Sequence, residues 1–335
     1  MSRIAVMGSG AWGTAIALSL ANRGGHDLTL WSHSRGVSET IAELGENTTF
    51  LPGFSIPRSI LATPEIEVAL RDAEIVVSVM PSHHVRASYE QFAPFLRSGQ
   101  LLVSATKGIE DESLQRMSEV IADVLRKFDL TLPVGVLSGP SFAQEVAAGS
   151  PTAITIASKS AELASRVQRE FGSQSLRLYT NEDVVGVELG GALKNVIAIA
   201  SGIVSGLGLG HNSAAALITR GIAETTRLAV ACGGRSETLA GLSGIGDLVL
   251  TCTGSLSRNR TVGIELGKGR NLEEILAGLH GKVAEGVRTT AAALGLASRH
   301  KVEMPITKQV AAILHEDKSP VEAMRDLMSR PGRDE

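Results

Sequence analysis

The sequence is poor in aromatic residues and in cysteine, and its charges nearly cancel. Phe, Trp and Tyr make up 3% of the 335 residues, which argues against the stacking surfaces that single-stranded nucleic acids need. The formal net charge of −3 is too small for a protein built to bind nucleic acid or a membrane surface. The two cysteines, Cys232 and Cys252, have no metal-ligand spacing. We therefore expect no disulfide framework and no metal site.

Two further features are missing. The N-terminal residues contain no basic segment followed by an apolar one, so we expect no secretory signal. The longest charge-free run of the central helix, Asn195 to Gly210, is shorter than the roughly 20 apolar residues that cross a bilayer. What is present, 43% hydrophobic residues, is enough for a large core, and the length suggests two domains. These observations predict a soluble, cytoplasmic protein without a transmembrane segment.

The chain begins with a dinucleotide-binding pattern. A short apolar strand, Ile4 to Met7, leads into the segment GSGAWG and then into an alanine-rich helix. In this G-x-G-x-x-G pattern Gly8 permits a tight turn, Gly10 lets the backbone approach a pyrophosphate, and Gly13 lets helix and strand pack closely. The phosphates bind at the helix N-terminus. A second strand, Leu28 to Trp31, completes the unit.

The residues after this second strand favour NADPH over NADH. NAD-specific sites usually place Asp or Glu here, to accept hydrogen bonds from the ribose hydroxyls. This chain reads Trp-Ser-His-Ser-Arg and has no carboxylate until Glu39. Ser34, His33 and Arg35 are donors, which suit a 2′-phosphate. A solvated loop that ignores the 2′ position is the alternative.

Further strands are expected at residues 74–80, 101–104, 134–137, 152–157 and 176–179, and they predict a mostly parallel sheet. In such sheets ligands bind beyond the carboxyl ends of the strands. Lys107 follows one strand on a glycine-containing turn, where it could contact an anion or a carbonyl; an ordinary surface lysine is the alternative. Ser141 follows another strand, and its spacing from Gln144 predicts a capping box and a helix start.

Strand patterns stop after residue 183, and the rest of the chain is mostly helical. We therefore predict an α/β Rossmann-type domain of residues 1–185 and an all-α domain of residues 186–335. The helix from Gly186 is apolar at three-and-four spacing and contains several glycines, each weakening an isolated helix by about 1 kcal/mol relative to Ala. Such a helix should pack closely against other backbone.

One cation, Lys194, interrupts this apolar helix. An apolar setting disfavours the charged form of a lysine, so that it can exchange a proton near neutral pH. Snorkelling of the side chain to solvent is the alternative. Further along, Asp247 stands among glycines and apolar residues, as an acid or as a helix N-cap. Arg258 and Arg260 follow, with donors that suit a phosphate or an exposed turn.

Eight short segments together resemble the bacterial NAD(P)-dependent sn-glycerol-3-phosphate dehydrogenases. They occur in that family's order over nearly the whole chain: GSGAWGTA near the start, PSH at Pro81 to His83, ATKG at Ala105 to Gly108, SGPSFA at Ser138 to Ala143, LKNVIA at Leu193 to Ala198, GIGDLVLTC at Gly244 to Cys252, SRN at Ser257 to Asn259 and VAEG at Val283 to Gly286. The combination is much more specific than the glycine pattern alone. The family usually has Ser where this chain has Ala11, which leaves only a backbone contact there.

The resemblance implies roles for individual residues. Lys194 would be the proton donor and acceptor, with Asp247 as the second catalytic residue. The substrate would bind to Lys107, Gly139, Ser141, Lys194, Asp247, Ser257, Arg258 and Asn259. The cofactor would bind to Gly8, Gly10, Ala11, Trp12, Gly13, His33, Lys107, Ala143, Arg258, Val283 and Glu285, beside the Arg35 already considered. The family further implies a homodimer and a cytoplasmic role at the head of phospholipid synthesis.

The resulting hypothesis is the reversible reduction of dihydroxyacetone phosphate to sn-glycerol 3-phosphate. The sheet domain would hold NADPH with its nicotinamide toward an interdomain cleft, and hydride would pass to the ketone carbon. Lys194 would deliver the proton, oriented by Asn195 and Asp247. Two alternatives remain open: a two-domain hydroxyacid dehydrogenase whose substrate carries a carboxylate, and a dinucleotide-binding sensor without turnover.

Overall fold

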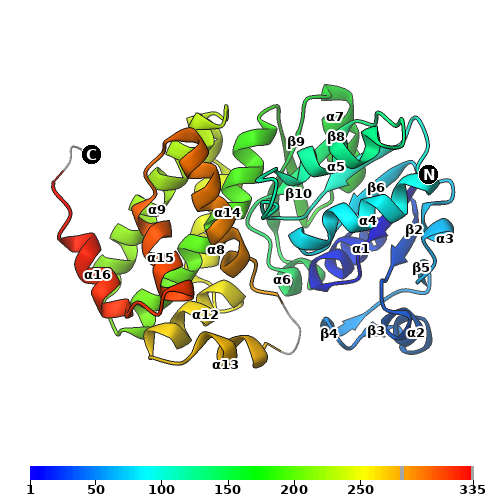
Figure 1. The fold of residues 1–335 in the computed structure, drawn as a ribbon. Coiled ribbons are helices and arrows are strands. Elements are labelled where there is room, and N and C mark those ends of the chain that lie inside the picture. Colours follow the sequence, from blue (N-terminus) through cyan, green and yellow to red (C-terminus); the bar gives the residue numbers. More distant parts are fainter. Residues whose placement is uncertain (280–282, 333–335) are drawn as a thin grey trace. The chain divides into compact units, whose positions relative to one another are not determined.

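The polypeptide of the computed structural model, which describes residues 1–279 and 283–332, divides into two compact units (Figure 1). The first comprises residues 1–107 and 116–187, and the second comprises residues 108–115 and 188–335. The chain therefore passes from the first unit to the second directly after Lys107, returns to the first after Gln115, and passes to the second again inside helix α8 (Val184–Gly206).

The first unit is built on an eight-stranded sheet in the order β10-β9-β8-β7-β6-β1-β2-β5. All neighbouring strands are parallel except β8 and β9, which confirms the predicted mostly parallel sheet. The strands are β1 (Ser2–Met7), β2 (His26–Trp31), β5 (Ile60–Thr63), β6 (Ile75–Ser78), β7 (Leu101–Ser104), β8 (Val134–Ser138), β9 (Thr152–Ser158) and β10 (Leu176–Asn181). The edge strand β5 has no counterpart among the predicted strands.

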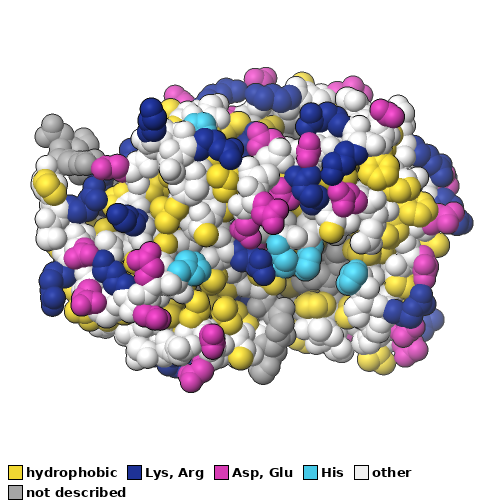
Figure 2. Space-filling model, viewed as in Figure 1, with side chains coloured by type: hydrophobic (Ala, Val, Ile, Leu, Met, Phe, Trp, Pro, Cys, Tyr) yellow, Lys and Arg dark blue, Asp and Glu magenta, His cyan; other side chains and the backbone are white. Residues whose placement is uncertain are grey.

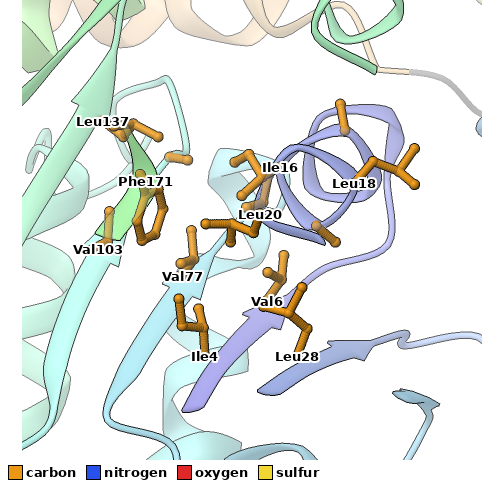
Figure 3. Close-up of a cluster of buried hydrophobic side chains, with 14 of the residues drawn as sticks. Ile4, Val6, Ile16, Leu18, Leu20, Leu28, Val77, Val103, Leu137 and Phe171 are labelled. Carbon is orange, nitrogen blue, oxygen red and sulfur yellow. The ribbon is translucent and has the colours of Figure 1, made fainter. Parts of the chain in front are cut away.

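Helices cover both faces of this sheet, as the two-residue alternation along β1 requires. Ile4 and Val6 face a core shared with α1 (Ala11–Arg23), α6 (Ala143–Ala147) and α7 (Ala161–Phe171). Figure 3 shows Ile16 and Leu20 of α1 above these strand residues and Val77. Ala5 and Met7 face the opposite core, with α3 (Ile66–Leu70), α4 (Val85–Phe92) and α5 (Met117–Arg126).

Smaller elements complete the first unit. Helix α2 (Arg35–Leu44) follows β2, and a short antiparallel pair, β3 (Glu46–Asn47) and β4 (Leu51–Ser55), follows α2. Two single 3-10 turns, η1 (Ser82–His84) and η2 (Ala93–Phe95), flank α4.

The second unit is helical. Its elements are the larger part of α8, α9 (His211–Ala231), α10 (Ser236–Leu239), the π-helical turn η3 (Leu242–Gly246), α11 (Asp247–Thr253), α12 (Arg258–Gly267), α13 (Leu272–Ala277), α14 (Glu285–His300), α15 (Pro305–His315) and α16 (Pro320–Met328). By length and composition α8 could cross a membrane, but 94% of its most apolar window is buried inside the protein. Helix α8 is therefore a core helix.

Residues 108–115 belong to the second unit because they pack on α14. Asp111 Oδ2 lies 3.7 Å from Arg288 Nη1, and Arg299 Nη2 donates to the Ser113 carbonyl at 3.3 Å. Leu114 covers Gly295, where a Cβ would lie 3.0 Å from its Cδ2 atom. The periodicity of the sequence does not predict that residues 108–115 pack in the second unit.

The glycines of α8 place its backbone directly against that of α12, as predicted. A Cβ at Gly202 would lie 2.1 Å from the Arg260 carbonyl oxygen, and one at Gly206 would lie 2.3 Å from that of Ile264. The contact is reciprocal, since a Cβ at Gly263 would lie 2.0 Å from the Ile199 carbonyl oxygen. No side chain larger than hydrogen fits between the two helices at these positions.

Charged side chains of both signs lie on the surface of the protein. On the face seen in Figure 2, Lys and Arg side chains are interspersed with Asp and Glu side chains. This mixture agrees with the small net charge of the sequence.

The contact between α8 and α12 predicts the effect of adding one methyl group. Gly202→Ala should lower the free energy of unfolding by about 1–3 kcal/mol, because overpacking outweighs the better helix propensity of Ala. The measurement is a urea titration followed by circular dichroism. Gly36→Ala is the matched control, since a Cβ there meets only Ser34 Oγ at 4.0 Å; this change should be neutral or stabilise. Stabilisation by both substitutions would contradict the close contact.

Candidate active site

The glycine turn of the first unit fits the pyrophosphate of a dinucleotide. Gly8 has φ +134°, and a Cβ on it would lie 1.9 Å from the Val79 carbonyl oxygen; a Cβ on Gly13 would lie 1.8 Å from that of Gly8. Gly10, in contrast, faces open space and caps α1 without any side-chain hydrogen bond. The first N–H groups of α1, including those of Ala11 and Trp12, therefore remain available to an anion at the helix start.

Buried polar groups hold this turn in place. Ser9 Oγ donates to Ser32 Oγ at 2.7 Å, which joins the turn to the residue after β2. Asn47 is 1% exposed, and its Nδ2 donates to the Ser9 carbonyl at 2.7 Å and to Thr14 Oγ1 at 2.9 Å. Sequence reasoning missed these residues, because no local pattern marks a hydrogen bond over more than 20 positions.

The donors predicted for a 2′-phosphate have different surroundings. Ser34 is exposed and caps α2, since its Oγ accepts the Val37 N–H at 3.5 Å. Arg35 is exposed, and its Nη2 lies 2.6 Å from Glu65 Oε1. His33 is also exposed, with its ring centroid 6.0 Å from that of Trp31.

Three predicted substrate residues meet beyond the carboxyl ends of β7 and β8. Lys107 Nζ donates to the Gly139 carbonyl at 3.3 Å, and Ser141 Oγ donates to the same oxygen at 3.0 Å. The predicted capping box is wrong, because α6 begins at Ala143 with Phe142 as its N-cap and without a side-chain hydrogen bond. The helix therefore starts one residue too late for Ser141 to be its N-cap.

In the second unit Lys194 and Asp247 form a buried ion pair. Lys194 Nζ donates to Asp247 Oδ1, and the two residues are 8% and 0% exposed. Lys194 therefore does not snorkel to solvent. Asp247 is the first residue of α11, with Gly246 as the N-cap and no side-chain capping bond, so the N-cap alternative is wrong as well. Thr251 Oγ1, which sequence reasoning missed, donates to the Asp247 carbonyl at 2.7 Å.

A second arrangement joins the starts of α12 and α14 to α8. Asn259 Nδ2 donates to Asn195 Oδ1 at 2.9 Å, and Asn259 Oδ1 accepts the Gly286 N–H at 3.0 Å. Ser257 caps α12, because its Oγ accepts the Arg260 N–H at 3.2 Å. Ser257 and Asn259, both predicted to bind substrate, are thus fixed relative to the helix that carries Lys194.

Arg258 lies between these two residues in the chain and is exposed. Although the residue as a whole is exposed, its guanidinium is partly desolvated by the surrounding protein, which lowers the pKa of Arg258; the carboxylate of Glu285 opposes that shift. Glu285 is the first residue of α14 and Val283 lies just before it, both partly buried. In residues 1–279 and 283–332 we find no cluster of three or more His, Cys, Asp or Glu side chains placed to hold a metal ion.

These parts define a class of protein. A glycine turn that opens a helix at the carboxyl edge of a parallel sheet binds a dinucleotide, and a buried lysine with its own carboxylate can transfer a proton. Together with a helical second unit, they are typical of two-domain, dinucleotide-dependent dehydrogenases.

Comparison with known proteins specifies the family. Residues 3–164 match the family model of the NAD-dependent glycerol-3-phosphate dehydrogenase N-terminus, and residues 183–325 match that of its C-terminus. The chain is 68% identical to a glycerol-3-phosphate dehydrogenase (NAD(P)+) of Acidobacterium capsulatum, over the full length of both, and 60% identical to that of Koribacter versatilis, over all of this chain and 99% of the other.

A solved structure supports the same family assignment. The glycerol-3-phosphate dehydrogenase of Coxiella burnetii superposes with a TM-score of 0.93 at 39% identity, covering 98% of this chain and 99% of that one. The chain belongs to the family of NAD(P)-dependent glycerol-3-phosphate dehydrogenases. The resemblance identified from the sequence is thereby confirmed.

The surroundings of Lys194 predict the behaviour of a nearby thiol. Cys252 is 2% exposed, and burial raises the pKa of its thiol to about 12, although the Lys194 charge acts in the opposite direction. Since the thiolate is the reactive form, iodoacetamide at pH 8 should leave Cys252 unmodified in the folded protein and should modify the partly buried Cys232 first. Peptide mass spectrometry measures both sites, and unfolding in urea should make them equally reactive. Rapid modification of Cys252 in the folded protein would contradict a closed environment around Lys194.

Proposed function

We propose that this chain reduces dihydroxyacetone phosphate to sn-glycerol 3-phosphate, reversibly and with NADPH as the preferred reductant over NADH. Family membership supports the reaction and the use of NAD(P). The single observation that carries the chemistry is the buried pair of Lys194 and Asp247. A lysine in an apolar helix needs a counter-charge to remain protonated. In this pair Lys194 is the acid–base group and Asp247 is the counter-charge.

Residues 1–185 would form the cofactor domain. The turn of Gly8, Gly10, Ala11, Trp12 and Gly13 would bind the pyrophosphate. Further contacts are assigned to Lys107, Ala143, Arg258, Val283 and Glu285. The preference for NADPH rests on His33 and Arg35, two exposed donors at the end of β2. The nicotinamide, when bound, supplies the hydride to the ketone carbon of the substrate.

Substrate binding is assigned to two sets of residues. Lys107, Gly139 and Ser141 form one, and Ser257, Arg258 and Asn259 form the other, in the domain of residues 186–335. A guanidinium beside a helix start suits a phosphate dianion, since both present hydrogen-bond donors to it. An unphosphorylated ketone would lose these contacts.

Lys194 would donate the proton to the substrate oxygen in the reduction and accept it in the oxidation. Its protonated Nζ donates a hydrogen bond to the ketone oxygen and gives up the proton as that oxygen becomes an alcohol. Asp247 stabilises the charged form of Lys194 before the transfer. The hydrogen bond from Asn259 fixes the side chain of Asn195. In the oxidative direction the neutral amine accepts the proton of the alcohol. A proton from water restores the starting state of Lys194.

The family resemblance also supports three proposals about the setting of the enzyme: a homodimer, a cytoplasmic location, and the supply of the glycerol backbone for phospholipid synthesis. Sedimentation velocity distinguishes a dimer from a monomer.

The test is oxidation of NADPH and of NADH, followed by absorbance, with three substrates. We expect turnover with dihydroxyacetone phosphate and at most weak turnover with dihydroxyacetone or a 2-keto acid. Activity on the keto acid alone would instead assign a hydroxyacid dehydrogenase. Cofactor binding without turnover of any substrate would assign a dinucleotide sensor.

Replacement of Lys194 tests the proton transfer. Lys194→Met should lower kcat by about 10²-fold or more, because the ketone oxygen loses its proton donor. The same change leaves Asp247 buried without its counter-charge, which destabilises the fold. The double variant Lys194→Met with Asp247→Asn removes both charges and should restore stability without restoring turnover.

Lys268→Met is the matched control, since Lys268 forms an exposed pair with Glu265 on the same unit. Its turnover should equal that of the unmodified enzyme. Unchanged kcat in Lys194→Met would exclude the assigned role of Lys194.

A further inference from the structure

The structure places a carboxylate at the end of β2, where the sequence after that strand has none. It comes from Glu65, two residues after the neighbouring strand β5. Trp31 is opposite Thr63 in the register of the two strands, and Ser32 N donates to the Thr63 carbonyl at 3.0 Å. Glu65 N donates to Thr63 Oγ1 at 3.1 Å. The backbone of Glu65 is therefore fixed beside the end of β2.

The carboxylate of Glu65 is paired with Arg35, the first residue of α2. Their Oε1 and Nη2 atoms are 2.6 Å apart, and the two side chains are 58% and 67% exposed. Water solvates both charges at this exposure, so the pair contributes little to stability and opens readily in favour of another charged partner. Each side chain can thus act on a ligand separately.

This pair lies next to the part of the first unit that fits a dinucleotide. The Ser9–Ser32 hydrogen bond connects the glycine turn directly to the residue after β2. A cofactor whose pyrophosphate lies at Gly10 extends its adenosine ribose toward the end of the second strand in this fold. The 2′ position of that ribose, a hydroxyl in NADH and a phosphate in NADPH, is the only difference between the two cofactors.

We propose that Arg35 and Glu65 together select between NADPH and NADH. Arg35 leaves Glu65 to bind the 2′-phosphate of NADPH, for which a guanidinium is well suited. Glu65 accepts a hydrogen bond from the 2′-hydroxyl of NADH, and so takes the part of the carboxylate that β2 lacks. The proposal rests on the NAD(P)-dependent function above and adds Glu65 as a specificity-determining residue.

The charges act in opposite directions on the two cofactors. Glu65 repels a 2′-phosphate and also restrains the arginine that binds it, so Glu65 lowers the preference for NADPH. Arg35 neutralises the carboxylate that NADH needs, so Arg35 lowers the preference for NADH. An enzyme with both residues accepts both cofactors; removal of Glu65 should shift its preference toward NADPH, and removal of Arg35 should shift it toward NADH.

The first experiment is calorimetric titration of the full-length protein with 2′,5′-ADP and with ADP, which carry the two forms of the ribose and no nicotinamide. Glu65→Gln should tighten binding of 2′,5′-ADP and weaken that of ADP, changing the ratio of the two Kd values by about tenfold. Arg35→Gln should change the same ratio by about tenfold in the opposite direction. A uniform loss of affinity for both ligands would indicate a merely structural role and would overturn the proposal.

The second experiment measures kcat/KM for NADPH and for NADH with dihydroxyacetone phosphate. The ratio of the two values should rise in Glu65→Gln and fall in Arg35→Gln. Asp72→Asn is the matched control: Asp72 is 50% exposed and pairs with Arg3 at 3.2 Å, but at the amino ends of the strands. Its backbone is left-handed, with φ 59°, which Asn tolerates. The ratio should not change in this variant.

The two proposals fail in different ways. An unchanged cofactor ratio in Glu65→Gln, in an enzyme that reduces dihydroxyacetone phosphate, would overturn the selector and leave the proposed function intact. Absence of turnover in the unmodified protein would overturn the proposed function, whereas the titrations with 2′,5′-ADP and ADP would still decide the role of Glu65.

Discussion

The buried pair of Lys194 and Asp247 is the constraint on which the second unit depends. A lysine in the middle of an apolar helix is costly to desolvate, and the aspartate that compensates it must be equally buried. The chain meets this requirement 53 positions later, where the π-helical turn η3 ends and α11 begins. Neither charge would be tolerated at its position without the other.

The packing of α8 fixes what surrounds that pair. Glycines at 202 and 206 bring the backbone of α12 into direct contact, which sets the distance and the rotation between the two helices. The start of α12 then lies where Asn259 can bond to Asn195, the neighbour of Lys194. The residues around Arg258 thus owe their position to glycines where other helices carry larger side chains.

The parts of the fold and of the candidate site that could be predicted are those marked by a pattern of residues close together in the sequence. The strand, glycine turn and helix at the start of the chain form one continuous pattern, and so does the apolar helix interrupted by Lys194. What could not be predicted depends on partners distant in the sequence. Strand β5 is four residues long and has little alternation, so only its pairing with β2 identifies it. The roles of Asn47 and of residues 108–115 likewise depend on contacts with elements distant in the sequence. Ser141 has the spacing of a cap, but α6 begins one residue later than that spacing requires.

The two ion pairs discussed here show how burial decides what a pair of charges can do. Lys194 and Asp247 are withdrawn from water, so their attraction is strong, their partners are fixed, and a change in the charge of one is felt fully by the other. Arg35 and Glu65 stand in water, where the same attraction is screened and either partner is replaceable by a ligand. A fixed pair suits proton transfer at a constant position, and an exchangeable pair suits discrimination between ligands of different charge. The sequence contains both pairs as ordinary charged residues, and only their burial in the fold distinguishes one pair from the other.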